Sequence, residues 1–208
     1  ILQGSGDPSF PPAAVTQMVK EAAQRGLKKV DGYVFADTGN FSSTPYGPGW
    51  SWDYLTDYYA APVGGLNMAE NVVSIIVKPG DSVGAPARLE FVPDTHYLRI
   101  SNSVTTVAAG GTNVVYLDRD PGATTIKLSG TMPIDAKDSD SDATVAVQDP
   151  ADYTADYLRQ ELIRAGLLGD VRTKGVVPDL IVRSWRRSIG NSADGARPAE
   201  RFAEIDTD

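Results

Sequence analysis

The stretch "NVVSIIVKPG" (residues 71–80) decides how this chain must be divided. Val and Ile dominate its first half and Pro-Gly ends it, a pattern typical of a buried strand that stops at a turn. Short segments rich in β-branched residues follow, separated by Gly, Pro, Asn and Asp: "ARLEFVPDTHYLRISNSVTTV", "GTNVVYLDRD" and "TTIKLSGTMPI". The sequence therefore predicts a β-rich antiparallel unit in the middle of the chain.

Helical patterns flank these strands on both sides. Residues 9–27 combine prolines in a first turn with Gly26 just past the last apolar position, which predicts a helix. Residues 149–168 begin with Asp149 as a candidate N-cap and stop at Gly166, which predicts a second helix.

The chain before the β-rich region also contains strand patterns. "ILQGSGDP" at the start is typical of a strand that enters a turn, and "KKVDGYVFADTGNF" (28–41) predicts a strand through Tyr33, Val34 and Phe35. Strand, helix and strand in succession indicate an α/β layer.

We therefore predict an α+β fold in which an α/β accessory domain is interrupted by a small β-rich antiparallel domain. The accessory domain is expected over 1–83 and 149–172, and the insert over 84–148. A charge-rich appendage is expected over 173–208.

The composition limits the function classes. The chain has 208 residues, a formal net charge of −8 and no cysteine. Its acidity argues against indiscriminate binding to nucleic acid, and the lack of cysteine excludes disulfides and thiol nucleophiles. No apolar run approaches the roughly 20 residues of a membrane span. We expect no signal peptide, and the opening resembles the middle of a protein.

Four short motifs could carry chemistry, and each has a simpler interpretation. His96 is the sole histidine and lacks a triad partner motif, so a surface or strand role is favoured. "GSGDPSF" (4–10) lacks the third glycine of a dinucleotide fingerprint. "DSDSDA" (138–143) has Ala143 where a calcium loop needs glycine. The arginines of "RSWRRS" (183–188) are interpreted as a solvated face. We predict neither a metal nor another cofactor.

The stretch "GPGWSWDYLTDYYAAP" (47–62) remains. It gathers two tryptophans, three tyrosines and two aspartates behind a Gly-Pro-Gly turn. Trp50, Asp53 and Tyr58 are spaced so that two rings and a carboxylate could form an ammonium pocket. A sugar, the aliphatic stem of a peptide, or a satellite hydrophobic cluster beneath a loop are alternatives that the spacing leaves open.

Several motifs in order resemble the class C low-molecular-mass penicillin-binding proteins, the D-alanyl-D-alanine carboxypeptidase/endopeptidases of bacterial cell-wall metabolism. They are Gly-x-Gly-Asp-Pro, the Asp37 strand end, Gly-Trp-x-Trp-Asp, Tyr-Tyr-Ala-Ala-Pro and Asn71-Val72-Val73. The resemblance covers about residues 1–172 and implies a periplasmic or cell-wall location for the parent family.

The catalytic motifs of that family do not occur in these residues. Its serine-peptidase domain carries Ser-x-x-Lys before a long insertion and Ser-x-Asn and Lys-Thr-Gly after it, and this chain resembles the insertion alone. "SNS" (101–103) and "RTKG" (172–175) are not matches. Because acylation needs a nucleophilic serine activated by a nearby lysine, we expect no catalytic residue here and no activity by the chain alone.

The resemblance also implies a role for the aromatic stretch. In family members this segment helps to form a pocket for the diamino acid side chain of the peptidoglycan stem peptide, and the matching positions are Trp50, Asp53 and Tyr58. The resemblance implies that the partner is the stem peptide, bound jointly with a catalytic domain.

The end of the chain resembles something else. "VVPDLIVRSWRRSIGNSADGARPAERFAEIDTD" is similar to the stretch ahead of the GAF sensor domain in bacterial transcription regulators.

Three functions follow from the sequence as hypotheses. The chain could be an accessory region of a carboxypeptidase, or a stand-alone module that binds peptidoglycan or protein. The third hypothesis, a regulatory fragment, rests on the tail alone.

Overall fold

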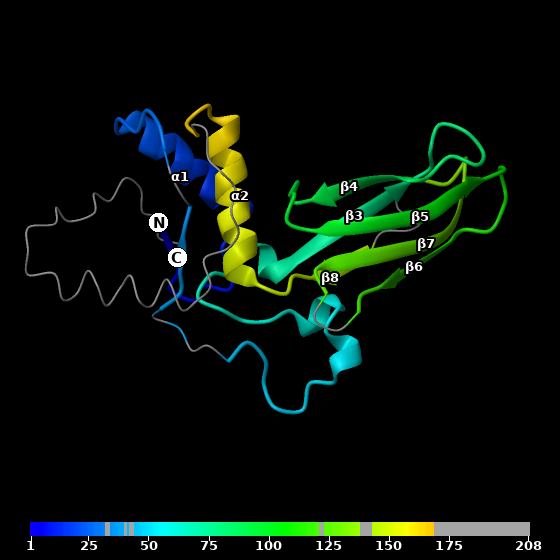
Figure 1. Ribbon diagram of the computed structural model, residues 1–208, viewed down its shortest axis with the longest axis horizontal. Helices are drawn as coiled ribbons and strands as arrows, with labels where there is room; N and C mark the ends of the chain where they lie inside the picture. The colour runs from blue at the N-terminus through cyan, green and yellow to red at the C-terminus, as the bar shows by residue number, and fades with distance from the viewer. Residues whose placement is uncertain (32–33, 40, 42–43, 121–122, 138–142, 169–208) are drawn as a thin grey trace, which may run out of the picture. The chain divides into compact units, whose positions relative to one another are not determined.

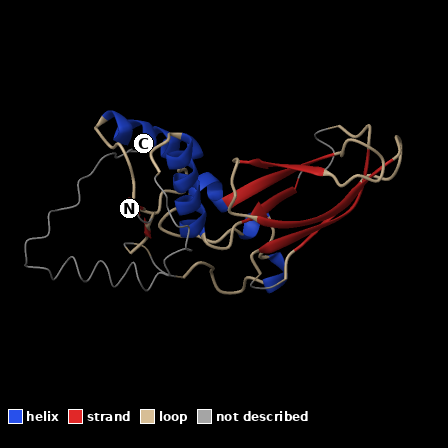
Figure 2. Ribbon diagram, turned by 45° about the horizontal axis from the view of Figure 1, so that its top comes forward, coloured by secondary structure: helices blue, strands red, loops and turns tan. Residues whose placement is uncertain are grey.

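The structure is a computed structural model that describes residues 1–31, 34–39, 41, 44–120, 123–137 and 143–168. The chain forms two compact units, each discontinuous in sequence. The first unit comprises 1–45, 63–70 and 149–208, and the second comprises 46–62 and 71–148. The two long helices belong to the first unit and the longer strands to the second, which confirms a mixed α+β fold (Figures 1 and 2).

A short parallel pair of strands opens the first unit. Strand β1 (Leu2–Gln3) pairs with β2 (Ala36–Asp37), with Leu2 opposite Ala36. The predicted strand through Tyr33, Val34 and Phe35 is thus displaced toward the C-terminus, and Tyr33 lies outside the described residues. Pairing with β1 decides the position of the strand, because strand propensity depends strongly on which neighbour is available.

Helix α1 (Pro12–Gln24) confirms the first predicted helix. Pro12 occupies the first turn, where its missing N–H costs no helical hydrogen bond. Gly26 adopts a φ of 104°, and the Leu27 N–H then bonds back to the Ala22 carbonyl at 2.9 Å. This left-handed C-terminal residue ends the helix and turns Leu27 toward its apolar face.

Helix α2 (Pro150–Arg164) begins and ends as its sequence predicts. The Asp149 carboxylate accepts a hydrogen bond of 3.0 Å from the Asp152 N–H, and Gly166 (φ 68°) follows the last turn. Buried side chains of the two helices and the segment after α2 form one hydrophobic cluster of Val19, Leu162 and Leu167, with Leu27, Val30, Val34, Leu158 and Leu168 packed against it.

Two three-stranded sheets make up most of the second unit. Strand β3 (Val72–Lys78) is central in the first sheet, antiparallel to both β4 (Arg88–Val92) and β8 (Ala143–Ala146). Every second residue of β3 is buried, as expected of a strand with one face in a core. That residues 84–148 form a separate inserted domain stays a prediction. The compact unit that contains these residues has wider bounds, 46–62 and 71–148, because β3 pairs with β4 and β8 within that unit.

The second sheet corrects the expectation of a wholly antiparallel unit. Its order is β5 (Arg99–Val107), β7 (Thr125–Pro133), β6 (Val114–Asp118), so β7 is central. β6 and β7 are antiparallel, whereas β5 and β7 run parallel over nine residue pairs. The chain reaches the far side of β7 through β6 and returns to the middle, and this crossover makes the β5–β7 pair parallel.

Side chains from both sheets supply the buried interior of the second unit. Fully or almost fully buried apolar residues come from β3, β5, β7 and β8: Val73, Ile75, Val77, Val104, Ile126, Leu128, Met132 and Val145. The Ala87 N–H donates to the Val104 carbonyl at 2.9 Å, so the chain before β4 also bonds to β5. Figure 1 shows the strands of the two sheets running along each other.

Candidate functional site

The aromatic segment (residues 46–62) belongs to the second unit and is built from two tight turns. They are the 3₁₀ helices η1 (Trp52–Tyr54) and η2 (Tyr58–Ala60). Backbone bonds such as Asp57 N–H to the Tyr54 carbonyl (2.9 Å) close the turns. Gly49 has a φ of 92°, a conformation open mainly to glycine, so the Gly-Pro-Gly sequence is what lets the chain turn into η1.

The backbone between η1 and η2 is attached to strand β8. Asp57 forms an antiparallel bridge with Val145, and the Ala146 N–H donates to the Thr56 carbonyl at 3.0 Å. Ala60, at the end of η2, is completely buried. The segment therefore has a fixed base on the sheet, from which its larger side chains project.

The three predicted site residues all lie on the outer side of this base. The side chains of Trp50 and Tyr58 are 47% and 62% exposed, and Asp53 is also exposed. The interpretation of these rings as a satellite hydrophobic core does not fit such exposure. Trp50 lies over the turn that precedes it, since a methyl group placed on Gly47 would be 3.6 Å from the indole nitrogen.

Three tyrosines form a ring cluster in which Tyr59 contacts both Tyr54 and Tyr58. The Tyr59 ring lies 5.5 Å from that of Tyr58 at 82° and 6.0 Å from that of Tyr54 at 59°, both within the range of favourable edge contacts. The Tyr59 hydroxyl donates a 2.6 Å hydrogen bond to Asp57. That bond, with smaller contributions from burial and nearby negative charges including Asp53, raises the pKa of Tyr59 to about 12.

This arrangement has a defined chemical capacity. Exposed ring faces attract a cation through their quadrupole, and a carboxylate beside them can pair with an ammonium group. No group in the segment is a strong nucleophile, and the single proton of the Tyr59 hydroxyl is already donated to Asp57. The exposed rings and carboxylates of the segment could bind an amine-bearing group.

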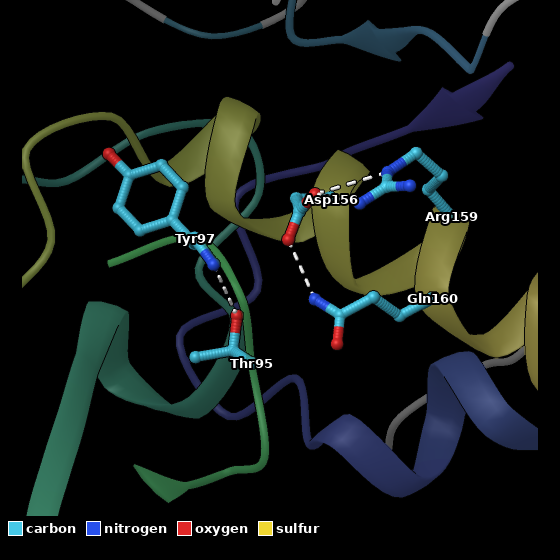
Figure 3. Close-up of polar contacts among 5 residues, drawn as sticks. All are labelled: Thr95, Tyr97, Asp156, Arg159 and Gln160. Atoms are coloured by element: carbon cyan, nitrogen blue, oxygen red, sulfur yellow. Dashed lines mark hydrogen bonds and ion pairs between the residues drawn. The ribbon is translucent and has the colours of Figure 1, made fainter. Parts of the chain in front are cut away.

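Helix α2 of the first unit carries a separate set of carboxylates. Burial, followed by the charges of Asp149 and Asp156, raises the pKa of Asp152 to about 6. The Asp156 carboxylate accepts hydrogen bonds from the Arg159 guanidinium at 3.0 Å and from the Gln160 amide at 2.6 Å, as Figure 3 shows.

Among the described residues no cluster of three or more histidine and carboxylate side chains could hold a metal ion.

The remaining motifs take simple structural roles where the structure describes them. His96 is exposed in a bend between β4 and β5. In the Gly-x-Gly turn after β1, a methyl group on Gly4 would lie 2.0 Å from the Gly65 carbonyl oxygen, so glycine is needed for close backbone contact. Most of "DSDSDA" and the whole of "RSWRRS" lie outside the described residues. No helix in the described ranges has the length and apolar character needed to cross a bilayer.

Sequence reasoning missed one residue that holds the aromatic segment. Arg119 follows β6 and is only 9% exposed, and its guanidinium donates to the carbonyls of Leu55 and Ala146. Asp118 and Asp120 flank it in sequence, which is typical of an exposed turn. No local signal in the sequence distinguishes Arg119 from a residue of such a turn, because its burial depends on partners that lie far from it along the chain.

A family profile and curated relatives connect this fold and segment to a known class. The profile of the D-Ala-D-Ala carboxypeptidase 3 (S13) family matches residues 1–177, and the chain belongs to that family. The D-alanyl-D-alanine carboxypeptidase of Actinomadura sp. (strain R39) is 30% identical over 187 residues, which cover 86% of this chain and 34% of that protein. DacB of Haemophilus influenzae is 32% identical over 71 residues, covering 34% of this chain and 15% of that protein.

Solved structures show the same fold. Penicillin binding protein 4 of Haemophilus influenzae matches with a TM-score of 0.63 and 21% identity, covering 85% of this chain and 38% of that one. The same protein in complex with a β-lactam matches with a TM-score of 0.50 and 15% identity, covering 82% of this chain and 35% of that one. The chain thus spans about a third of the Actinomadura relative and of these structures. The resemblance of the tail to a pre-GAF segment concerns residues outside the described part of the chain.

Proposed function

We propose that this chain is the non-catalytic accessory region of a D-Ala-D-Ala carboxypeptidase-like penicillin-binding protein that acts on peptidoglycan. Its aromatic segment would form one wall of a pocket for the diamino acid side chain of the stem peptide. A serine-peptidase domain carrying Ser-x-x-Lys, Ser-x-Asn and Lys-Thr-Gly, none of which occurs in these 208 residues, would supply the opposite wall. Action would take place on the periplasmic or extracellular side, where peptidoglycan is found.

The observation that carries this proposal is the exposure of aromatic side chains on an anchored backbone. Trp50 and Tyr58 stay about half or more exposed although Thr56 and Asp57 between them bond to β8. Ordered rings left in solvent are typical of a surface that a ligand or partner covers. Asp53 lies in η1 between them and supplies the negative charge that an ammonium group needs.

Each residue has a distinct role in the proposed pocket. The Asp53 carboxylate would pair with the side-chain ammonium of the diamino acid, and the faces of Trp50 and Tyr58 would contact its aliphatic stem and the cation. Since one wall alone removes little ligand surface from water, affinity of the isolated chain would be weak.

Nuclear magnetic resonance can test the pocket on the full chain. A stem peptide containing meso-diaminopimelate is titrated while the Trp50 indole and Tyr58 ring signals are followed, and the same peptide with its side-chain amine acetylated serves as the ligand control. Shifts that saturate with the free amine, and that Asp53→Asn weakens about threefold, support an amine site of exposed ion-pair strength. Asp81→Asn, which removes an equal charge from an exposed position of the same unit, should leave binding unchanged.

The result also separates the accessory role from its rival. Saturable binding by the chain alone favours a stand-alone peptidoglycan-binding module, which the exposure of the rings also supports. Lack of response favours an accessory region that needs its second wall. Equal shifts with the acetylated peptide would contradict the ammonium pocket.

A further inference from the structure

Arg119 occupies an unusual place for an arginine. It directly follows the last residue of β6, yet its side chain turns inward and is 9% exposed. Its Nη1 donates to the Ala146 carbonyl at 2.8 Å, and its Nη2 donates to the Leu55 carbonyl. One rigid guanidinium therefore links the sheet of β6 to strand β8 and to the aromatic segment.

The two acceptors are located where the aromatic segment is attached. Leu55 lies between η1 and η2, and Ala146 is the residue of β8 whose N–H bonds to the Thr56 carbonyl. The guanidinium and the backbone bond therefore hold adjacent points of the same connection. Because the donors of arginine are fixed in a plane, two simultaneous bonds define direction as well as distance.

The electrostatic setting of Arg119 disfavours burial of its charge. Burial lowers the pKa of Arg119, an effect that the neighbouring Tyr46 and Tyr97 partly oppose. Its sequence neighbour Asp120 pairs instead with Lys127 at 2.6 Å. The bonds that the Arg119 guanidinium makes to Leu55 and Ala146 are to neutral carbonyls. Burial of a charge opposes folding unless its hydrogen-bonding groups are satisfied, so these two bonds restrict the arrangement in which Arg119 can be buried.

We infer that Arg119 is a positioning residue for the aromatic segment: it fixes the junction of η1 and η2 against β8, so that Trp50, Asp53 and Tyr58 are held in one arrangement for their ligand. Arg119 itself does not touch that ligand. The identity of the ligand rests on the function proposed above, whereas the positioning of the segment does not.

The experiment compares full-length variants with different donor sets. Arg119→Met keeps an aliphatic stem and removes both bonds, and Arg119→Lys keeps the charge but replaces the planar fork with a single ammonium. Arg88→Met is the matched control, since Arg88 is exposed on β4 of the same unit and pairs with Asp81. The readouts are the indole N–H signals of Trp50 and Trp52, the hydrogen exchange of the Ala146 amide, and the β5–β7 amides as a measure of intact fold.

Positioning predicts a specific pattern. In Arg119→Met the two indole signals should shift or broaden and Ala146 exchange should accelerate at least about tenfold, while the β5–β7 amides stay protected. Arg119→Lys should restore these signals only in part, and Arg88→Met should resemble the wild-type chain. Unchanged indole signals and Ala146 exchange in Arg119→Met would overturn the inference, as would uniform loss of protection throughout the unit in both Arg119→Met and Arg119→Lys.

A binding measurement with the stem peptide keeps this inference distinct from the proposed function. If the diaminopimelate peptide binds the wild-type chain, Arg119→Met should weaken binding about tenfold through lost preorganisation. Unaltered affinity would contradict positioning for the ligand. If the wild-type chain binds no peptide, the indole and exchange readouts still decide whether Arg119 orders the segment.

Discussion

The hydroxyl of Tyr59 donates a 2.6 Å hydrogen bond to the carboxylate of Asp57, two residues earlier in the chain. Asp57 also pairs through its backbone with Val145 of β8, so the bond connects an exposed ring to the anchored part of the aromatic segment. Tyr59 in turn contacts the rings of Tyr54 and Tyr58. The orientation of one proposed site residue, Tyr58, thereby depends on Asp57, a carboxylate outside the predicted set of Trp50, Asp53 and Tyr58.

The pKa of Tyr59 gives the first prediction. It is raised from 10.0 to about 12, so the folded chain holds the phenolic proton more tightly than the unfolded chain. The stabilising contribution of the bond is complete below pH 10 and disappears as the pH rises through about 12. Titration of assigned tyrosine ring signals should show this late midpoint, and Asp57→Asn should lower it toward 10.0. Asp53→Asn should lower it less, because Asp53 acts only through its charge.

The carboxyl group of Asp152 provides a prediction at lower pH. Its pKa rises from 3.8 to about 6 because the charged form is partly buried and lies near Asp149 and Asp156. A carboxyl whose folded pKa is raised contributes stability fully below pH 3.8 and loses that contribution as the pH rises through about 6. Asp152→Asn should therefore be more stable than the wild-type chain at neutral pH and lose this advantage near pH 4.

Titration of the Asp152 carboxyl carbon checks the cause of that difference. Asp156→Asn removes one of the two neighbouring negative charges and should lower the Asp152 midpoint, without returning it to 3.8 because burial is the larger cause. A wild-type midpoint close to 3.8 would disprove the prediction.

The helical cluster of the first unit gives a prediction about stability. Leu162 is 6% exposed and packs with Val19 and Leu167. Leu162→Ala should lower the unfolding free energy of this unit by about 2–5 kcal/mol, through lost burial and a residual cavity. Native-state hydrogen exchange of α1 and α2 amides measures this loss for the unit itself. Ile163→Ala, at a neighbouring position that is 50% exposed, should change it by no more than about 0.5 kcal/mol, and equal losses would contradict the assigned packing.

Both long helices could be predicted because their signals are local. Gly26 and Gly166 end helices through their own backbone conformations, and Asp149 caps α2 from the adjacent position. The strand at Ala36–Asp37 and the parallel β5–β7 pair could not, because partner choice depends on residues far along the chain. The aromatic residues of the proposed site were visible for the same local reason. Arg119 was not, since its burial depends on Leu55 and Ala146, 64 and 27 residues away.

The chemistry absent from this sequence gives the last prediction: a fluorescent penicillin should leave the chain unlabelled. Acylation by a β-lactam requires a serine activated by a lysine three positions later, and no Ser-x-x-Lys occurs in the 208 residues. Penicillin binding protein 4 of Haemophilus influenzae, whose structure is known with a β-lactam, is a suitable positive control on a denaturing gel. A labelled band from this chain that survives denaturation would reveal a nucleophile within it. Peptide mapping of the adduct would then identify that serine, and the proposed non-catalytic role would be wrong.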